Sequence, residues 1–264
     1  MSDVGPLPPD LQRRLATAYL GRRYYFYPAT DSTNDVAMTL AAEGEAEGTV
    51  VATDYQRRGR GRRSHTWESP PHSNLMFSII LRPRGDARAA LPVTLVMATA
   101  ISVTLTKLLD RDLLVKWPND VVTGDGKKIA GILAESASSG DSLLHLVAGV
   151  GVNVNVATFP DELAATATSC RILTGVDWDR ADLLADLLGT IEAYYDRFAR
   201  DGFEALVSSY QARLLQAGKR VAFERGGERV AGRVTGIARD GALRVGLDDA
   251  SQIELYGEHV EVVE

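Results

Sequence analysis

The chain has 264 residues, of which 45% are hydrophobic and 24% charged, and its formal net charge is −6 at pH 7. This composition is ordinary for a globular protein, and the length suffices for one large domain and a small second one. No apolar run approaches the ~20 residues that span a bilayer, and the N-terminus has no apolar signal core. We therefore expect a cytoplasmic protein without a membrane partner.

In chain order, hydrophobic periodicity and turn residues predict alternating helices and strands as far as residue 154. A short helix after Pro8-Pro9 should stop at Gly21, and an alanine-rich helix after Asp31-Ser32-Thr33-Asn34 should end at Gly44. Residues 90–109 are apolar nearly all round, which predicts a buried helix. The expected strands are 24–27, 48–54, 75–82, 113–117, 129–135 and 143–154, the last two joined as a hairpin.

Beyond residue 154, an amphipathic helix is expected over 183–198 and a further helix over 203–216. After Gly218 the pattern changes to short alternating runs that are split by Gly-Gly, Asp-Gly and Asp-Asp turns, which predicts a small barrel. Its strands are expected over 220–223, 229–237, 242–247, 252–256 and 260–263. We therefore expect two domains, 1–217 and 218–264.

A basic, glycine-rich run is the most informative local feature of the chain. It reads Gln56-Arg57-Arg58-Gly59-Arg60-Gly61-Arg62-Arg63, and residues 55–65 hold five arginines and no acid in an otherwise acidic protein. Clustered positive charge on a backbone that glycine makes flexible favours a phosphate or carboxylate site.

Several common sites are absent from the sequence. There is no Gly-rich loop ending in Lys-Ser or Lys-Thr, and no G-x-G-x-x-G run opens a helix after a strand. The four histidines are scattered and no cysteine pair exists, so we expect no zinc site. The single cysteine, Cys170, cannot form an internal disulfide, and no histidine lies nearby to make it a nucleophile.

Five stretches in the first 155 residues stand out, although each alone has an ordinary structural explanation: a helix cap, a solvated loop, a turn, a solvated strand edge and close strand packing. They are Asp31-Ser32-Thr33-Asn34, the arginine loop ending at Trp67, Lys116-Trp117-Pro118-Asn119-Asp120, Lys127-Lys128-Ile129-Ala130-Gly131 and Gly149-Val150-Gly151-Val152-Asn153.

Together, in this order and spacing, the stretches resemble the catalytic domain of bacterial biotin protein ligases, also called biotin–acetyl-CoA-carboxylase ligases. The motif match covers roughly residues 25–160, and its GRGR, KWPND and KxAGIL elements lie within about 75 residues. The resemblance implies an α/β (α+β) fold, with a mixed β-sheet flanked by helices as in class II synthetase-like biotin/lipoate ligases. It also implies a small C-terminal Src-homology-3-like β-barrel.

Two departures from the family pattern are visible. Ser64 stands where the family loop more often has a second glycine, which could stiffen the loop. Only about 24 residues precede the first expected strand, too few for the DNA-binding repressor domain of many relatives. The resemblance therefore implies a ligase without the repressor function and without a DNA partner. It leaves a homodimer possible, because some relatives dimerise through sheet edges.

The activity that the resemblance implies has two steps. Biotin and ATP, with Mg²⁺, form biotinyl-5′-AMP, and biotin then passes to one lysine of a biotin carboxyl carrier protein or domain. Both substrates are anionic, so the site must neutralise several negative charges, and guanidinium groups pair with carboxylate and phosphate through two hydrogen bonds.

By resemblance, two overlapping groups of residues bind the substrates. The expected biotin-binding residues are Ser32, Thr33, Asn34, Gln56, Gly59, Arg60, Gly61, Arg62, Lys128 and Gly131. The expected ATP- and adenylate-binding residues are Arg60, Arg62, Trp67, Lys116, Asn119, Asp120, Lys128 and Asn153, with Trp67 stacked on adenine and Asn153 at its edge. The expected catalytic residues are Lys128, Arg62 and Asp120.

Asp120 is expected in a turn and has two further hypothetical roles. It is a candidate magnesium ligand, and it could accept a proton from the acceptor lysine. That lysine needs help because roughly one unperturbed lysine in a few thousand is neutral at pH 7.

Other functions remain open at this level. A lipoate or other acyl–protein ligase shares the same chemistry, and a scaffold that binds biotin without catalysis would share the pocket. A nucleic-acid-binding module could use the arginine loop, but residues 218–264 hold seven basic and nine acidic residues, which disfavours it.

Overall fold

The computed structural model describes residues 7, 11–84, 86–140 and 142–263. Its larger part is built on a seven-stranded sheet with the order β1-β2-β3-β7-β6-β5-β4. β1 and β2 pair in parallel and the other neighbours are antiparallel, so the expected mixed sheet is confirmed. Its strands are β1 Tyr24–Tyr27, β2 Val50–Thr53, β3 Leu75–Leu81, β4 Leu113–Lys116, β5 Asp120–Thr123, β6 Lys128–Ser139 and β7 Ser142–Val152.

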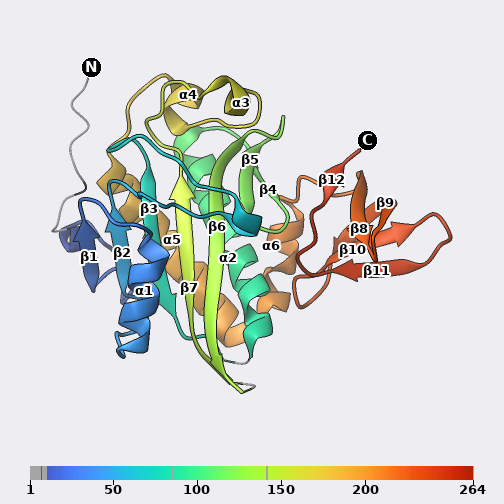
Figure 1. Ribbon diagram of the computed structural model, residues 1–264, viewed down its shortest axis with the longest axis horizontal. Coiled ribbons are helices and arrows are strands. Elements are labelled where there is room, and N and C mark those ends of the chain that lie inside the picture. The colour runs from blue at the N-terminus through green and yellow to red at the C-terminus, as the bar shows by residue number, and fades with distance from the viewer. Residues whose placement is uncertain (1–6, 8–10, 85, 141, 264) are drawn as a thin grey trace.

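Helices cover both faces of this sheet (Figure 1). Helix α1 (Thr33–Ala42) lies on one face, and α2 (Ala90–Leu109) packs on the other with α5 (Arg180–Asp201) against it. Alternation along the strands produces two cores, because neighbouring residues point to opposite faces. Val51, Ile80 and Val147 pack in the small core with α1. The residues that precede and follow each of them in its strand belong to the main core.

Helix α2 is long and apolar enough to cross a membrane, although the sequence analysis expected no apolar run of that length. However, 72% of the apolar 18-residue segment of this helix is buried inside the protein. The expectation of a buried core helix over 90–109 is confirmed, and its apolar character is explained by contacts with the sheet and with α5.

Two expected helices are shorter than predicted. In place of a helix over 11–18, only Leu11–Arg13 forms a 3₁₀ turn (η1), because the backbone N–H groups of residues 18–20 donate to the Glu192 carboxylate of α5 at 2.7–2.9 Å. The helix expected over 203–216 is divided into η4 (Phe203–Leu206) and α6 (Val207–Gln211). It ends there because residues 213–215 exchange backbone hydrogen bonds with Val115 of β4.

The sequence patterns also missed several short elements. β5 occupies Asp120–Thr123, so Asp120 begins a strand rather than lying in the turn. The remaining short helices are η2 Arg62–Ser64, η3 Ala87–Ala89, α3 Asp161–Ala164 and α4 Cys170–Thr174.

The C-terminal part is a five-stranded antiparallel sheet with the order β11-β10-β9-β8-β12, as the turn pattern predicted. Its strands are β8 Arg220–Arg225, β9 Glu228–Ile237, β10 Leu243–Leu247, β11 Gln252–Leu255 and β12 Glu261–Val262. In Figure 1 this barrel projects to one side of the large sheet.

Trp117 of the KWPND motif joins the two parts. Its side chain is 2% exposed, and its indole Nε1 donates to the Gly241 carbonyl of the barrel at 3.1 Å. Its backbone N–H donates to Gln216 Oε1 at 2.9 Å, and Gln216 Nε2 donates to the Trp117 carbonyl at 3.2 Å. The turn that carries Asn119 and Asp120 is therefore anchored on the barrel.

Candidate active site

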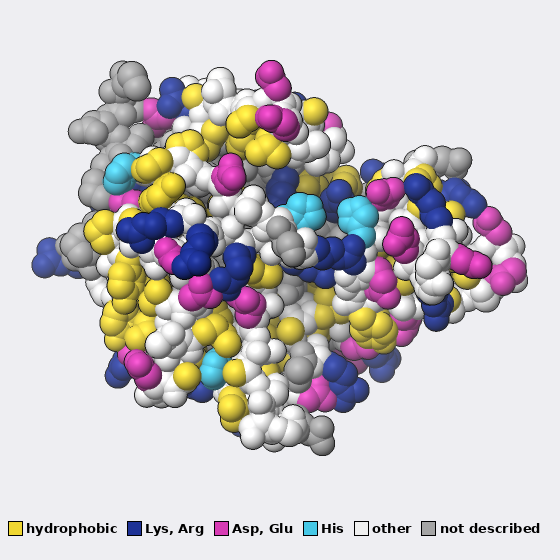
Figure 2. All heavy atoms as spheres, in the orientation of Figure 1, with side chains coloured by type: hydrophobic (Ala, Val, Ile, Leu, Met, Phe, Trp, Pro, Cys, Tyr) yellow, Lys and Arg dark blue, Asp and Glu magenta, His cyan; other side chains and the backbone are white. Residues whose placement is uncertain are grey.

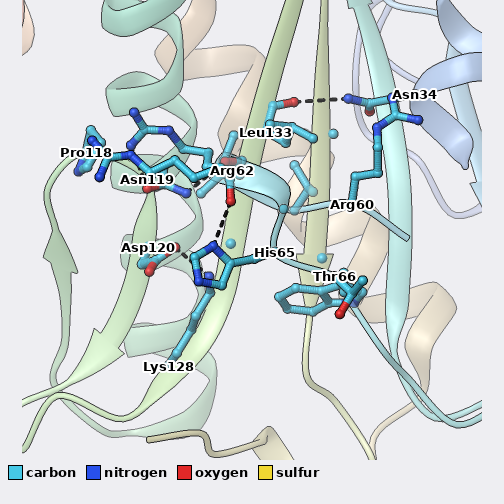
Figure 3. Close-up of a pocket in the computed structure, with 18 of the residues that line it drawn as sticks. Asn34, Arg60, Arg62, His65, Thr66, Pro118, Asn119, Asp120, Lys128 and Leu133 are labelled. Carbon is cyan, nitrogen blue, oxygen red and sulfur yellow. Dashed lines mark hydrogen bonds and ion pairs between the residues drawn. The ribbon is translucent and has the colours of Figure 1, made fainter. Parts of the chain in front are cut away.

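A cavity of about 280 Å³ lies over β6 and β7, between the arginine loop and the barrel. Its walls come from the start of α1, residues 56–67, the turn between β4 and β5, and residues 258–260 of the barrel. Figure 3 shows the side chains of the loop and of the β5–β6 region facing one another across it. Of the expected site residues, all but Gly59 and Asn153 line this cavity.

Three glycines form the floor of the cavity. Gly131 of β6 and Gly151 of β7 are register partners, and Gly149 lies on the same face of β7. A Cβ atom on Gly151 would stand 2.5 Å from the Trp67 ring, and one on Gly149 would stand 2.2 Å from Asn34 Oδ1. The glycines therefore allow neighbouring groups to approach the sheet more closely than any side chain would permit.

One end of the cavity is a buried network of hydroxyl and amide groups. Thr33 donates its backbone N–H and its hydroxyl to Gln56 Oε1 at 2.8 and 3.1 Å. Ser78 Oγ lies 2.7 Å from Thr33 Oγ1 and 2.6 Å from Asn34 Oδ1. Ser32 caps α1 beside them and is 4% exposed. This end offers several donors and acceptors whose positions are set by one another.

The arginine loop is fastened to the rim of the cavity by Arg60. Its Nη1 donates to both Asp35 carboxylate oxygens at 2.7 and 2.8 Å, and its Nη2 lies 2.9 Å from Glu135 Oε2. Gly59 lies just outside the cavity, where a Cβ would stand 2.3 Å from the Trp67 carbonyl oxygen. Gly59 therefore serves the loop's own packing, with the Trp67 N–H donating to its carbonyl at 2.9 Å.

Arg62 spans the cavity from the loop to both the KWPND turn and the barrel. Its Nη1 donates to Asn119 Oδ1 at 3.2 Å, and its Nη2 donates to the Gly257 carbonyl at 2.9 Å, which also accepts from Arg63. Burial, and then the charge of Arg63, lower the pKa of Arg62. Among the described residues, no carboxylate forms an ion pair with Arg62, which makes its guanidinium a suitable partner for an incoming anion.

Lys128 lies at the centre of the wall opposite the loop. Its Nζ is 2.7 Å from Asp120 Oδ1 and 5.7 Å from the centroid of the Trp67 ring. Lys116 is the register partner of Asp120 and lines the same wall. Asn119 is held from both sides, because its Nδ2 donates to the Ile132 carbonyl at 3.1 Å while its Oδ1 accepts from Arg62.

Figure 2 shows how charge is distributed on this face. Dark-blue basic side chains form a band across its middle, magenta acidic side chains border the band, and two histidines lie near the C-terminal part. Most arginines of the loop have acidic partners: Arg57 and Arg58 pair with Asp31, and Arg60 pairs with Asp35 and Glu135. The loop is therefore held by ion pairs rather than exposed as a free polyanion-binding surface.

Comparison with known proteins gives the chain a family. The Biotin/lipoate A/B protein ligase family matches residues 26–153, and the Biotin protein ligase C terminal domain matches residues 217–258. The biotin–[acetyl-CoA-carboxylase] ligase of Paracoccus denitrificans is 35% identical over 236 residues, which cover 86% of this chain and 92% of that protein. The chain belongs to the biotin protein ligase family.

Two further relatives agree with this assignment. The bifunctional ligase/repressor BirA of Bacillus subtilis is 30% identical to this ligase over 255 residues, which cover 96% of this chain and 78% of that protein. The solved biotin protein ligase from Aquifex aeolicus, in complex with biotin and ATP, superimposes with a TM-score of 0.78 at 26% identity. That superposition covers 91% of this chain and 99% of the other.

Asn153, like Gly59, is an expected site residue that does not line the cavity. It is 6% exposed, its Oδ1 accepts from Asn74 at 3.1 Å and its Nδ2 donates to the Thr168 carbonyl at 3.1 Å. Both polar atoms of the Asn153 amide are therefore used to hold neighbouring segments together. This accounts for an asparagine after β7 without a ligand-binding role.

The cavity of the ligase also contains residues to which the sequence analysis assigned no role. His65 and Thr66 come from the loop, Gly149 and Gly151 from the floor, and Glu258, His259 and Val260 from the barrel. His65 could have been noticed from its place between Arg63 and Trp67. The barrel residues carried no comparable signal, because only folding brings them to a loop almost 200 positions away in the chain.

The described part of the ligase holds no group of three or more His, Cys, Asp or Glu side chains that could bind a metal ion. Asp120 lines the cavity, and its carboxylate is paired with Lys128. A single carboxylate suits a Mg²⁺ ion that is held mainly by substrate phosphates, since Mg²⁺ often uses one or two carboxylates in this way.

Proposed function

We propose that this ligase binds biotin and ATP in the cavity, forms biotinyl-5′-AMP with release of pyrophosphate, and transfers biotin to a lysine of a biotin carboxyl carrier domain. The observation that carries the proposal is the meeting of Arg62 and Lys128 with the Thr33–Gln56–Asn34 network in one cavity. The Paracoccus relative is a biotin–[acetyl-CoA-carboxylase] ligase and the Aquifex ligase was solved with biotin and ATP, which supports the same substrates here.

In this proposal, the hydroxyl and amide end binds the polar head of biotin. A urea group has both donors and acceptors, and the Ser32–Thr33–Asn34 segment with Gln56 supplies their complements. The hydrocarbon part of biotin would lie over Gly131 and Gly151, where the floor has no side chains. Its carboxylate would then be directed toward Lys128 and Arg62.

The adenylation step needs positive charge because two anions must meet. A carboxylate oxygen of biotin bonds to the α-phosphorus of ATP, and the bond to pyrophosphate breaks. We assign Lys128 to the oxygens at the reacting centre and Arg62 to the phosphates, with Lys116 and Asn119 as further phosphate contacts. The partial burial of Arg62 strengthens its interaction with an anion, since fewer water molecules compete for it.

We assign the magnesium contact to Asp120. When bound, Mg²⁺ would neutralise phosphate charge, and Asp120, which is paired with Lys128, would supply a carboxylate to hold it. Trp67, whose buried Nε1 has no hydrogen-bond partner among the described residues, is assigned to stacking on adenine. The interior contacts of Asn153 support a structural role for that residue instead.

The arginine loop is assigned to protecting the adenylate. A mixed anhydride hydrolyses readily, so a cover that excludes water raises the yield of transfer. Gly59 and Gly61 lie on both sides of Arg60, and the Arg60 ion pairs with Asp35 and Glu135 hold the loop across the cavity. We also propose the domain division at residue 217 and a cytoplasmic location, where an unpaired cysteine stays reduced.

The test is mass spectrometry of purified protein with biotin, Mg-ATP and a biotin carboxyl carrier domain. The proposal expects the carrier to gain the mass of one biotinyl group, only with ATP present and with release of AMP. A gain with lipoate or octanoate but not with biotin would contradict the substrate assignment. No gain with any of these acids would contradict the transfer step.

A further inference from the structure

His65 is a cavity residue to which the proposed chemistry gives no role. It follows the arginine run and lines the cavity together with Lys128, Asp120 and Trp67. Figure 3 shows its imidazole ring on the loop side of the cavity, between the backbone of Arg62 and the region of Lys128 and Asp120. The side chain of His65 is exposed, so a group that enters the cavity from solvent can reach it.

The orientation of the His65 ring defines its neutral form. Nδ1 lies 2.9 Å from the Arg62 carbonyl oxygen, which can only accept a hydrogen bond. Nδ1 must therefore carry the proton, and the neutral ring keeps its lone pair on Nε2. The same carbonyl also accepts the His65 backbone N–H at 3.1 Å, so the ring and its own backbone are held at one point.

The transfer half-reaction requires a proton acceptor. The other charged groups around the cavity are Arg62 and Arg63 on the loop, Lys116, Asp120 and Lys128 on the sheet, and Glu258 and His259 on the barrel. The arginines and lysines already carry protons. A group with an available lone pair at the mouth of the cavity is required.

Three of these groups could in principle accept a proton, but each is occupied. Asp120 is paired with Lys128 at 2.7 Å. Glu258 Oε2 accepts the backbone N–H groups of Tyr256 and Gly257 at 2.7 and 2.9 Å. His259 lines the cavity, but its Nε2 lies 3.4 Å from the carboxylate of Glu261, a residue that is not part of the lining.

We propose that His65 Nε2 is the general base for transfer of biotin to the acceptor lysine, an inference that rests on the transfer step proposed above. The acceptor ammonium first gives one proton to water. The amine nitrogen then bonds to the carbonyl carbon of biotinyl-5′-AMP, the bond from that carbon to the phosphate oxygen breaks, and its electron pair leaves with AMP. His65 takes the second proton from the nitrogen and later returns it to water. Imidazole suits this task because it changes charge between about pH 5 and 8.

The test separates the two half-reactions with His65→Gln, which retains an N–H donor for the Arg62 carbonyl and removes the base. Single-turnover transfer from preformed biotinyl-5′-AMP to a carrier domain is measured across pH, and adenylation is measured separately as pyrophosphate release. We expect transfer to fall by about 100-fold or more with adenylation unchanged. Through the range in which imidazole loses its charge, the wild-type rate should rise more steeply with pH than the variant rate, and above it both rates should rise in parallel as the acceptor amine is deprotonated.

Two further variants complete the test. Added imidazole should restore transfer in His65→Ala, and His72→Gln, an exposed histidine outside the cavity, should behave as wild type. Unchanged transfer in His65→Gln, or an equal loss in both half-reactions, would overturn the proposal. If Asp120→Asn alone removed the pH dependence of transfer, the base would be Asp120. A wild-type protein that transferred nothing would refute the transfer step itself, which distinguishes the two failures.

Discussion

Lys128 approaches the cavity with one carboxylate as its partner. Its Nζ is 2.7 Å from Asp120 Oδ1 and its side chain is 35% exposed, so the ion pair places the ammonium without burying it completely. An ion pair of this exposure contributes modestly to stability, since water screens it. Loss of Lys128 should therefore affect catalysis far more than folding.

Lys128→Ala should reduce adenylation by roughly 100-fold or more, because it removes a cation placed where negative charge concentrates. Pyrophosphate release measures the rate, and thermal unfolding measures the effect on the fold. Lys127→Ala is the matched control, because Lys127 precedes β6 and lies outside the cavity lining. Turnover of Lys128→Ala near that of the control would remove Lys128 from the mechanism.

Gly149→Ala should destabilise the protein by about 1–3 kcal/mol, the usual cost of overpacking. The added methyl group would stand 2.2 Å from Asn34 Oδ1 and would displace Asn34 from Ser78. Urea unfolding measures the loss. Gly189→Ala in α5 is the control, because a Cβ there has no neighbour within 4 Å and alanine favours a helix. Equal stability of Gly149→Ala and wild type would show that Asn34 can move without cost.

Cys170 should resist thiol reagents as long as the protein is folded. Its side chain is fully buried and burial raises its pKa to about 12, so at pH 8 the thiol stays protonated and the reactive thiolate is absent. Labelling with iodoacetamide at pH 8 should require urea. Rapid labelling in native buffer would mean that α4 opens readily, since Cys170 is its first residue.

The residues that sequence predicts best in this protein are those whose chemistry is carried by short motifs. The arginines, Lys128 and the Ser32–Thr33–Asn34 segment were selected from such motifs, and the structure brings them to one cavity. Asn153 was selected in the same way but holds Asn74 and Thr168, because an amide suits an interior junction as well as a ligand. Glu258 carried no local signal, since its place at the cavity depends on the barrel's docking.

At the scale of elements, the arginine loop is a short cover fastened at both sides. Arg60 holds α1 through Asp35 and β6 through Glu135, while Arg62 holds the KWPND turn and the barrel. The loop can open only when these contacts separate. Its closure therefore depends on ion pairs and hydrogen bonds between elements, and not on the loop sequence alone.

Arg60→Ala should release biotinyl-5′-AMP faster than wild type, because the loop loses its ion pairs with Asp35 and Glu135. Leakage is measured as adenylate recovered in solution in the absence of an acceptor. Arg58→Ala is the matched control: Arg58 belongs to the same loop, is paired with Asp31 and lies outside the cavity lining. Equal leakage from Arg60→Ala and this control would count against closure by the loop.

The long elements were predictable from periodicity, and the failures have a common physical cause. Residues 18–20 give their N–H groups to Glu192, and residues 213–215 pair with β4, so contacts distant in sequence replaced local helical hydrogen bonds. β5 was missed because its first residue, Asp120, is typical of turns and only Val121, Val122 and Thr123 remain before Gly124.

At the scale of the whole molecule, the barrel is joined to the sheet through the same turn that carries Asn119 and Asp120. Gln216 is fully buried and makes hydrogen bonds to both the N–H and the carbonyl of Trp117. The position of the turn thus depends on the segment that leads into the barrel.

Gln216→Ala should lower the free energy of unfolding by about 1–3 kcal/mol, because it leaves two buried backbone groups of Trp117 without partners. Urea unfolding followed by tryptophan fluorescence measures the change. Gln252→Ala, whose exposed side chain contacts Thr235 within the barrel, is the control and should change little. A loss no larger than that of the control would mean that Trp117 Nε1 and its Gly241 contact suffice to hold the junction.

The walls of the cavity come from residues between Ser32 and Val260, and this span has a consequence for biosynthesis. A chain leaves the ribosome from its N-terminus, and domains generally fold in that order. The sheet with Lys128 can therefore form while the barrel is still being translated, at a time when Arg62 has no Gly257 carbonyl to bind. A nascent chain at this stage has the sheet residues that line the cavity but lacks the wall formed by residues 258–260. Translation therefore supplies the barrel wall after the sheet, and the cavity is enclosed only once the barrel has folded.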